Sequence, residues 1–499
     1  MSHTLPSATV LGYPRIGRNR EMKKAVEAFW AGRIDGEALE EALAGVRRES
    51  RARMVELGLS ATGGAVPSDA TAYDHMLDAA TTFGAIPRRF SHLVGEGGAV
   101  DRAGYFTLAR GEGELAPLEM TKWFDSNYHY LVPEISPTTT FTYAEDRIVR
   151  EYREAAAEGT EVRPVIVGPV SFLLLAKEEV GDGGSDAYAL GGAEATAFIP
   201  LHRLDDLIGA YADLLRDLGA AGAPWIQFDE PALVADGEVS AAQLAEAVER
   251  AYATLGAVEG RPSILLTTPY GEAREVFPAV AAAPVEAIGL DLVRGSLPTG
   301  DHAALLDGRT VVAGIVSGRN IWRADLAAAL DTLEELKASV GERGSVVVGT
   351  STSLLHVPHD AERETDLDPD LRSWLAFADQ KVTEVVTLAR GLAEGREAVA
   401  SEVEVASAAL ASREAHPGTH RTEVRERTSA IDDGATSRVA YAQRAREQRA
   451  SLTLPPLPTT TIGSFPQTKE IRVARAAHRR GELDDAGYQA AMREEIAEV

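Results

Sequence analysis

The sequence LGYPRIGRNREMKK, residues 11–24, decides how the rest of the chain is interpreted. It overlaps a short apolar segment, ATVLGY at residues 8–13, that is typical of a buried strand. Tyr13-Pro14 and Gly17 disfavour regular backbone, and a helical pattern begins after them. The stretch therefore predicts a strand, an irregular loop and a helix, which together indicate the start of a domain.

The same arrangement returns near the other end of the chain as TTTIGSFPQTKEIR, residues 459–472. Glu470 and Arg472 follow Glu21 and Lys23 at a separation of 449 residues. This period is far longer than the roughly 20–50 residues of a solenoid repeat. It indicates a duplicated domain, and the second copy is expected to be incomplete because the sequence ends inside a predicted helix.

Apolar strand-like segments alternate with Ala/Leu/Glu-rich helical segments over the middle of the chain. This alternation predicts a parallel sheet covered by helices on both faces. Six strands are predicted at residues 165–167, 225–228, 264–267, 287–290, 311–315 and 345–349. Together with the strand near residue 10 and room for another before residue 119, they favour a (β/α)8 barrel over a doubly wound open sheet.

Three regions are predicted from this pattern. Residues 1–370 form an amino-terminal (β/α)8 TIM-like barrel, and residues 371–451, rich in Ala, Glu and Arg, form a helical linker. Residues 452–499 form the first segment of a second, duplicated (β/α)8 barrel. A complete barrel needs roughly 250 residues, so this last region does not close a barrel core by itself.

Composition excludes several classes of function. The formal charge of −26 argues against binding to nucleic acid or to an anionic membrane surface. No apolar segment approaches the length of a transmembrane helix, and no basic-then-apolar leader is present, so we expect a cytoplasmic protein. The sequence has no cysteine, which excludes disulfides, thiolate zinc sites and cysteine nucleophiles within these residues.

Five cations in the opening stretch allow two interpretations. Arg15, Arg18, Arg20, Lys23 and Lys24 are compatible with an ordinary solvated helix face. They are also compatible with a binding site for a chain of carboxylates, because Arg20 and Lys23 share one helix face and arginine binds carboxylates in a bidentate manner. Lys122, beside Trp123 and Phe124, is a further candidate.

Two other motifs are interpreted as structural. Asp229-Glu230-Pro231 follows a predicted strand, and we favour structural capping or a vestigial site over catalysis. His356 and His359 are separated by Pro358, which argues against a helical metal-ligand face and favours a loop with incidental histidines.

Several longer motifs resemble the cobalamin-independent methionine synthase family. They are LGYPRIGRNREMKKA at 11–25, EMTKWFDSNYHYLVPE at 119–134, WIQFDEPALV at 225–234, GRNIWRADL at 318–326 and TTTIGSFPQTKEIR at 459–472. The resemblance implies two duplicated barrels that transfer a methyl group from 5-methyltetrahydropteroyltriglutamate, a folate polyglutamate, to L-homocysteine. It also implies that the folate polyglutamate tail binds Arg20, Glu21, Met22, Lys23 and Lys122, and that homocysteine binds Ile462, Gly463 and Ser464.

The resemblance further implies zinc in the complete protein, held by histidine, glutamate and two cysteines of the second barrel. The sequence ends before these ligands, so no catalytic residue and no metal ligand is predicted within it. We therefore expect a chain that is inactive alone, either because the enzyme is truncated or because the gene record is incomplete. We also expect a monomer. The alternative is a non-catalytic barrel that binds folate or another polyanion.

Overall fold

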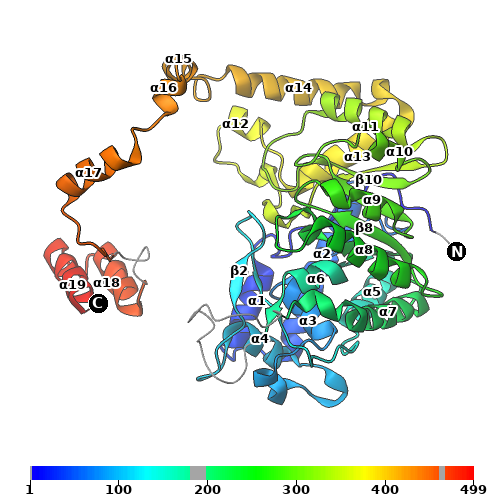
Figure 1. Cartoon of the computed structure of the whole chain (residues 1–499), viewed down its shortest axis with the longest axis horizontal. Helices are drawn as coiled ribbons and strands as arrows, with labels where there is room; N and C mark the ends of the chain where they lie inside the picture. Colours follow the sequence, from blue (N-terminus) through cyan, green and yellow to red (C-terminus); the bar gives the residue numbers. More distant parts are fainter. Residues whose placement is uncertain (1–2, 180–197, 460–466, 499) are drawn as a thin grey trace. The chain divides into compact units, whose positions relative to one another are not determined.

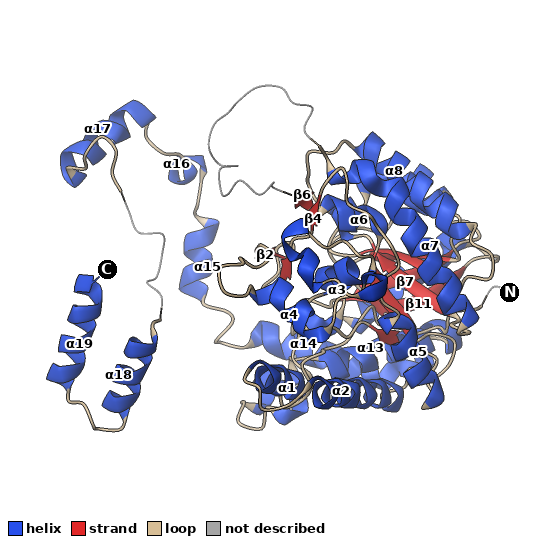
Figure 2. Cartoon of the chain, turned by 90° about the horizontal axis from the view of Figure 1, so that it is seen from below, coloured by secondary structure: helices blue, strands red, loops and turns tan. Residues whose placement is uncertain are grey.

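The computed structural model describes residues 3–179, 198–459 and 467–498. The chain divides into two compact units, Met1–His420 and Arg421–Val499, each of which is described by itself. The first unit contains a central parallel sheet with helices around it, as Figures 1 and 2 show.

Seven strands of the first unit form one parallel sheet in the order β1-β5-β7-β8-β9-β10-β11. Their bounds are Pro67–Ser68 (β1), Arg163–Val167 (β5), Trp225–Asp229 (β7), Ser263–Thr268 (β8), Ala287–Asp291 (β9), Thr310–Val316 (β10) and Ser345–Thr350 (β11). The spatial order follows the sequence without the reversal that a doubly wound sheet requires.

The segment 7–10 is the eighth strand and closes the sheet into a barrel. Ala8 pairs in parallel with Val348 of β11, and the backbone N–H of Thr9 donates to the Val348 carbonyl at 2.9 Å. The Thr9 hydroxyl reaches the other edge of the sheet, where it donates to the Ala65 carbonyl at 2.6 Å, just before β1. The predicted (β/α)8 fold of the first unit is therefore confirmed.

Helices surround the barrel. The helices of the first unit are α1 (Glu21–Trp30), α2 (Gly36–Glu56), α3 (His75–Thr82), α4 (Arg102–Arg110), α5 (Arg147–Ala157), α6 (Pro169–Leu174), α7 (Leu204–Ala220), α8 (Ala241–Gly256), α9 (Phe277–Ala282), α10 (Asp301–Ala304), α11 (Leu326–Val340), α12 (Pro369–Ser373), α13 (Ala378–Glu394) and α14 (Ala400–Ala415). Several of them, such as α7, α8 and α11, bury an apolar face in the main cluster against the strands. In Figure 2, helices such as α7 and α8 lie around the central strands.

The buried apolar residues form separate layers. One large cluster fills the space between the outer faces of the strands and the helices, and includes Phe228, Ile264 and Tyr252. A small cluster that includes Trp225 and Leu265 fills the barrel interior. The alternation of Trp225 inward and Ile226 outward is the period of two expected of a strand that is buried on both faces.

A long insertion separates β1 from β5. It contains α3, α4, the antiparallel pair β2 (Met120–Lys122) and β3 (His129–Leu131), and the short strand β4 (Glu134–Ile135). β4 pairs in parallel with β6 (Lys177–Glu178), which follows β5. A second apolar cluster forms under this insertion, where Leu77, Phe90 and Leu108 pack against α1 and α2. The insertion therefore packs against α1, the helix that carries Lys23 and Lys24.

The boundary of the first unit differs from the predicted one. The sequence assigned residues 371–451 to a linker, but α13 and α14 belong to the first unit, which extends to His420. Val382, Val385 and Leu388 of α13 lie in the main apolar cluster, because this helix completes the last strand–helix pair of the barrel. An Ala/Glu-rich composition does not distinguish such a helix from a linker helix.

The second unit contains helices α15 (Thr422–Ser429), α16 (Asp433–Thr436), α17 (Tyr441–Leu452), α18 (Lys469–Arg479) and α19 (Asp485–Glu498). The α18–α19 pair repeats the α1–α2 pair. Asp35 caps α2 by accepting from Ala38 N at 2.9 Å, and Asp484 accepts from Gly487 N at 2.7 Å. Gly32 and Gly481 both have positive φ, 65° and 73°. Each pair of positions is 449 residues apart, so the internal repeat extends to the local structure.

None of the helices in the described part of the chain combines the length and apolar character needed to cross a membrane.

Candidate functional site

The cationic stretch, residues 11–24, forms an irregular loop after the first strand and then the first turn of α1. The part before α1 is called the cationic loop below. Gly17 has φ 81°, and a β-carbon there would lie 2.2 Å from Glu21 Oε2, so glycine is required. Arg20, the residue before α1, is also left-handed with φ 63°. The loop therefore has a specific, irregular backbone shape.

Two of the cations make internal contacts. Arg15 donates through Nη2 to the Tyr73 carbonyl and stacks over the ring of Tyr128 at 4.7 Å. Burial lowers the pKa of Arg15. Arg18 pairs with Asp379 at 3.2 Å. These two arginines hold the loop in place and are engaged by other residues of the protein.

The other three cations are exposed. Lys23 lies 3.7 Å from Glu27 across one helical turn, and both side chains are about half exposed. Within the described residues, Arg20 and Lys24 have no ion pair. Solvent screening makes the Lys23–Glu27 pair weak, so Lys23 can exchange it for a ligand carboxylate at low cost.

The other predicted tail-binding residues differ in their exposure. Lys122 is exposed on β2, whereas Met22 packs against the second apolar cluster. The Glu21 carboxylate accepts from the backbone and side-chain nitrogens of Asn19, at 2.9 and 2.8 Å. Among the predicted tail-binding residues, the exposed cations are therefore Arg20, Lys23 and Lys122.

The β2–β3 hairpin that carries Lys122 is anchored over the barrel mouth. Trp123 Nε1 donates to the Tyr270 hydroxyl at 3.0 Å. Asp125 accepts from Arg319 at 2.6 Å and also pairs with Arg294. Because Arg15 of the loop stacks on Tyr128 of the same hairpin, the two cation-bearing segments are joined directly.

The carboxylates at the strand ends are engaged within the protein. Glu230 is fully buried and accepts from the backbone nitrogens of Val170 and Ser171, at 3.2 and 2.6 Å, and from the Tyr252 hydroxyl at 2.7 Å. It thus caps the amino terminus of α6, as the structural interpretation expects. Asp229 accepts from Thr267 Oγ1 at 2.6 Å.

Glu230 makes stability depend on pH. Burial raises the pKa of Glu230 to about 7, whereas an unfolded glutamate titrates at about 4.3. The folded protein therefore binds the extra proton between these values, and the contribution of Glu230 to stability is present at low pH and lost as pH rises through about 7. From pH 5 to 8, we expect wild type to lose roughly 1–3 kcal/mol relative to Glu230→Gln, as measured by urea unfolding.

The exposed Glu238 provides the control for this experiment. Glu238→Gln should follow the pH profile of wild type. A constant difference between wild type and Glu230→Gln across this range would contradict the assignment.

The histidine pair is not arranged as a metal site. His356 Nε2 lies 2.9 Å from the Tyr270 hydroxyl, and burial lowers the pKa of His356 to about 4. Across the described residues, no group of three or more His, Asp or Glu side chains is placed to hold a metal ion. The absence of cysteine means that residues 1–499 do not supply the thiolates of the zinc site implied by the resemblance. The predicted homocysteine residues Ile462, Gly463 and Ser464 lie outside the described residues.

Sequence reasoning missed the residues that hold the loop. Asp379 and Arg363 contact Arg18 but lie more than 340 residues away along the chain. No local pattern marks them, because each occurs in an ordinary polar segment. Arg319, which anchors the β2–β3 hairpin through Asp125, does lie in a motif visible in the sequence, GRNIWRADL.

The fold and the site define a (β/α)8-barrel protein with a cationic loop and an anchored hairpin. Comparison with known proteins gives the family. The model of the cobalamin-independent synthase amino-terminal domain matches residues 7–341, and that of the catalytic domain of the same synthase matches residues 457–499. The chain belongs to the cobalamin-independent methionine synthase family.

Curated relatives agree with this family. A 5-methyltetrahydropteroyltriglutamate–homocysteine methyltransferase of Mycobacterium tuberculosis is 49% identical over 494 residues, and that of Rhodococcus jostii is 48% identical over 500 residues. Each match covers 99% of this chain but 61% of the relative, so the chain spans about three fifths of their length. A B12-independent methionine synthase structure from Shewanella aligns with a TM-score of 0.48 at 16% identity, over 80% of this chain and 99% of the other.

Proposed function

We propose that this chain is part of a zinc-dependent methyltransferase that moves the methyl group of 5-methyltetrahydropteroyltriglutamate to L-homocysteine. The family matches at both ends of the chain support this proposal. Zinc would activate the homocysteine sulfur as a thiolate, but residues 1–499 lack the cysteines for that site. We therefore assign to residues 1–499 the binding of the folate substrate and not the activation of the homocysteine sulfur.

Within that reaction, the first barrel binds the triglutamate tail through Arg20, Lys23 and Lys122. The observation that supports this role is that these three cations stay exposed while Arg15 and Arg18 are engaged internally. The tail is a chain of carboxylates, and a protein with a net charge of −26 needs such a local group of cations to attract it. Arginine adds bidentate geometry to the charge.

Removal of single cations tests this role. We expect Arg20→Ala and Lys122→Ala each to weaken binding of 5-methyltetrahydropteroyltriglutamate about two- to fivefold, since one exposed ion pair contributes about 0.5–1 kcal/mol. Affinity should fall further with added salt because the attraction is screened. Isothermal titration calorimetry at two salt concentrations measures both effects.

Arg343→Ala is the matched control, because Arg343 is 80% exposed and pairs only with Asp307 among the described residues. It should leave the affinity unchanged. Tail binding by these cations is wrong if wild type does not bind the triglutamate at low salt. It is also wrong if Arg20→Ala and Lys122→Ala bind the triglutamate as tightly as Arg343→Ala does.

A further inference from the structure

The cationic loop is fixed by residues from the far end of the first unit. Arg18 Nη2 donates to Asp379 Oδ2 at 3.2 Å, and Asp379 lies in the first turn of α13. The Asp379 side chain is only 1% exposed, whereas that of Arg18 is 36% exposed. A buried carboxylate therefore holds a cation that would otherwise point into solvent.

Asp379 also contacts both sides of the loop. It accepts from the Tyr13 hydroxyl, which precedes the loop, and from Arg53 Nε of α2 at 2.8 Å, which follows it. One carboxylate thus joins the end of the first strand, the loop and the second helix. Removing its charge would release these three contacts together.

Arg363 holds the loop by a second route. Its guanidinium donates to the Arg18 carbonyl at 3.1 Å and to Asn19 Oδ1 at 2.9 Å. Asn19 donates in turn to the Glu21 carboxylate at 2.9 Å. These contacts surround Arg20, whose left-handed backbone at φ 63° is one that an unsupported arginine rarely adopts.

We propose that Asp379, through Arg18, and Arg363 are positioning residues for recognition of the glutamate tail. This inference rests on the proposed function. They hold residues 17–21 in the one conformation that directs Arg20 and Lys23 outward, so the ligand does not have to order the loop when it binds. Without them, part of the binding free energy is spent on that ordering. The same restraint keeps Arg18 away from the ligand, which sets the number of cations that the tail meets.

The test compares ligands with long and short tails on the full chain. We expect Arg18→Gln, Arg363→Gln and Asp379→Asn each to weaken binding of 5-methyltetrahydropteroyltriglutamate about tenfold, and to leave the much weaker binding of the monoglutamate unchanged. Arg18→Lys, which keeps a cation beside Asp379, should restore most of the loss. If a variant instead weakens binding of the triglutamate and the monoglutamate equally, it has lost structure in general, and the positioning role is contradicted.

Arg53→Gln is the matched control, because it removes a different ion pair of the same carboxylate and leaves the loop contact intact. It should change triglutamate affinity by less than about twofold. If Asp379→Asn does not fold, the Arg18 and Arg363 variants alone decide the result, since both alter exposed side chains.

Two results separate this inference from the proposed function. If the Arg18 and Arg363 variants bind the triglutamate as tightly as wild type while Arg20→Ala and Lys122→Ala bind it more weakly, the positioning role is wrong and tail binding stands. If Arg20→Ala and Lys122→Ala also bind the triglutamate as tightly as wild type, the positioning role and tail binding by these cations are both wrong.

Discussion

Replacement of Arg163 with methionine is expected to lower the free energy of unfolding of the first unit by about 3–5 kcal/mol. Arg163 begins β5 inside the barrel and is 0% exposed. Its guanidinium donates to Thr9 Oγ1 and the Val10 carbonyl, both at 2.8 Å, to Gln227 Oε1 at 3.0 Å, and to the Gly64 carbonyl. Methionine fills similar space but removes the donor of each of these hydrogen bonds from a buried site.

The position of Arg163 explains why the effect should be large. It bridges the segment 7–10 and the residues before β1, where the Thr9 side chain replaces the regular ladder found between the other strands. Its charge also faces the buried carboxylates of Asp69 and Asp229, and burial lowers the pKa of Arg163 to about 10. Loss of the guanidinium therefore weakens the contact between the segment 7–10 and the residues before β1, and it removes a countercharge of Asp229.

Urea unfolding followed by circular dichroism measures this loss. Arg343→Met, at an 80% exposed position, is the control and should change stability by less than about 0.5 kcal/mol. Suppose that Arg163→Met lowers the free energy of unfolding by less than about 1 kcal/mol and that the slope of this energy with urea concentration is unchanged. That result would contradict the role of Arg163 in closing the barrel.

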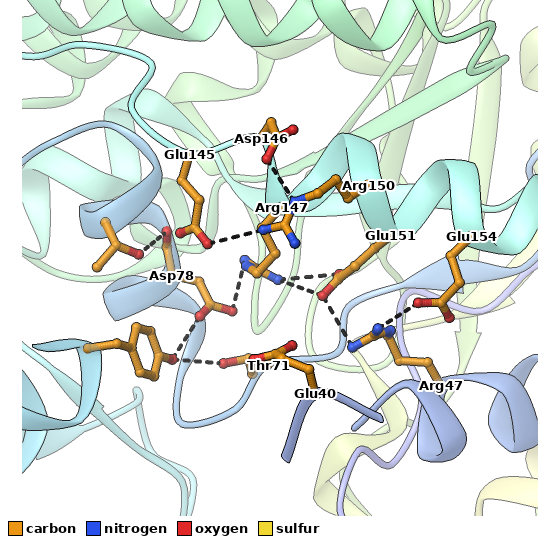
Figure 3. A network of polar contacts seen from close by, with 12 residues as sticks. Glu40, Arg47, Thr71, Asp78, Glu145, Asp146, Arg147, Arg150, Glu151 and Glu154 are labelled. Carbon is orange, nitrogen blue, oxygen red and sulfur yellow. Dashed lines mark hydrogen bonds and ion pairs between the residues drawn. The ribbon is translucent and has the colours of Figure 1, made fainter. Parts of the chain in front are cut away.

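Replacement of Arg147 with methionine is expected to cost about 2–4 kcal/mol at neutral pH. Arg147 lies at the centre of the network in Figure 3, where its guanidinium contacts Asp78 at 3.2 Å and Glu151 at 3.3 Å. Its side chain is 10% exposed, and theirs are 8% and 12%. Burial lowers the pKa of Arg147, but Asp78, Glu151 and Glu145 outweigh that effect and raise it.

The network joins separate parts of the fold, so its loss should affect the whole unit. Asp78 belongs to α3 and also accepts from the Tyr105 hydroxyl of α4 at 2.7 Å. Glu151 of α5 pairs with Arg47 of α2 at 3.4 Å. Without Arg147, the carboxylates of Asp78, Glu145 and Glu151 would face one another with no central countercharge.

Arg150→Met is the control for this prediction, because Arg150 is on the same helix and pairs with Asp146 and Glu145 but is 59% exposed. Both variants are measured by urea unfolding, and Arg150→Met should lower the free energy of unfolding by less than about 1 kcal/mol. Equal losses for the two variants would show that burial of the network does not matter.

Prediction from sequence succeeded where a feature depends on neighbouring residues. The six predicted strands match β5 and β7–β11 to within a few residues, because continuous apolar segments between helical patterns are a local signal. The internal repeat was also visible, since Asp35 and Asp484 are caps whose hydrogen bonds reach only three residues ahead. The segment 67–68 was not located, because β1 has only two residues.

The sequence by itself determined the alternation of strands and helices, the duplication, the absence of cysteine and the presence of a cationic loop. Only the tertiary structure decided that Arg15 and Arg18 are engaged internally while Arg20, Lys23 and Lys122 remain exposed. It also decided that α13 belongs to the barrel. The physical reason is that the availability of a charge depends on the partners that folding brings to it, and Asp379 reaches Arg18 across 361 residues of chain.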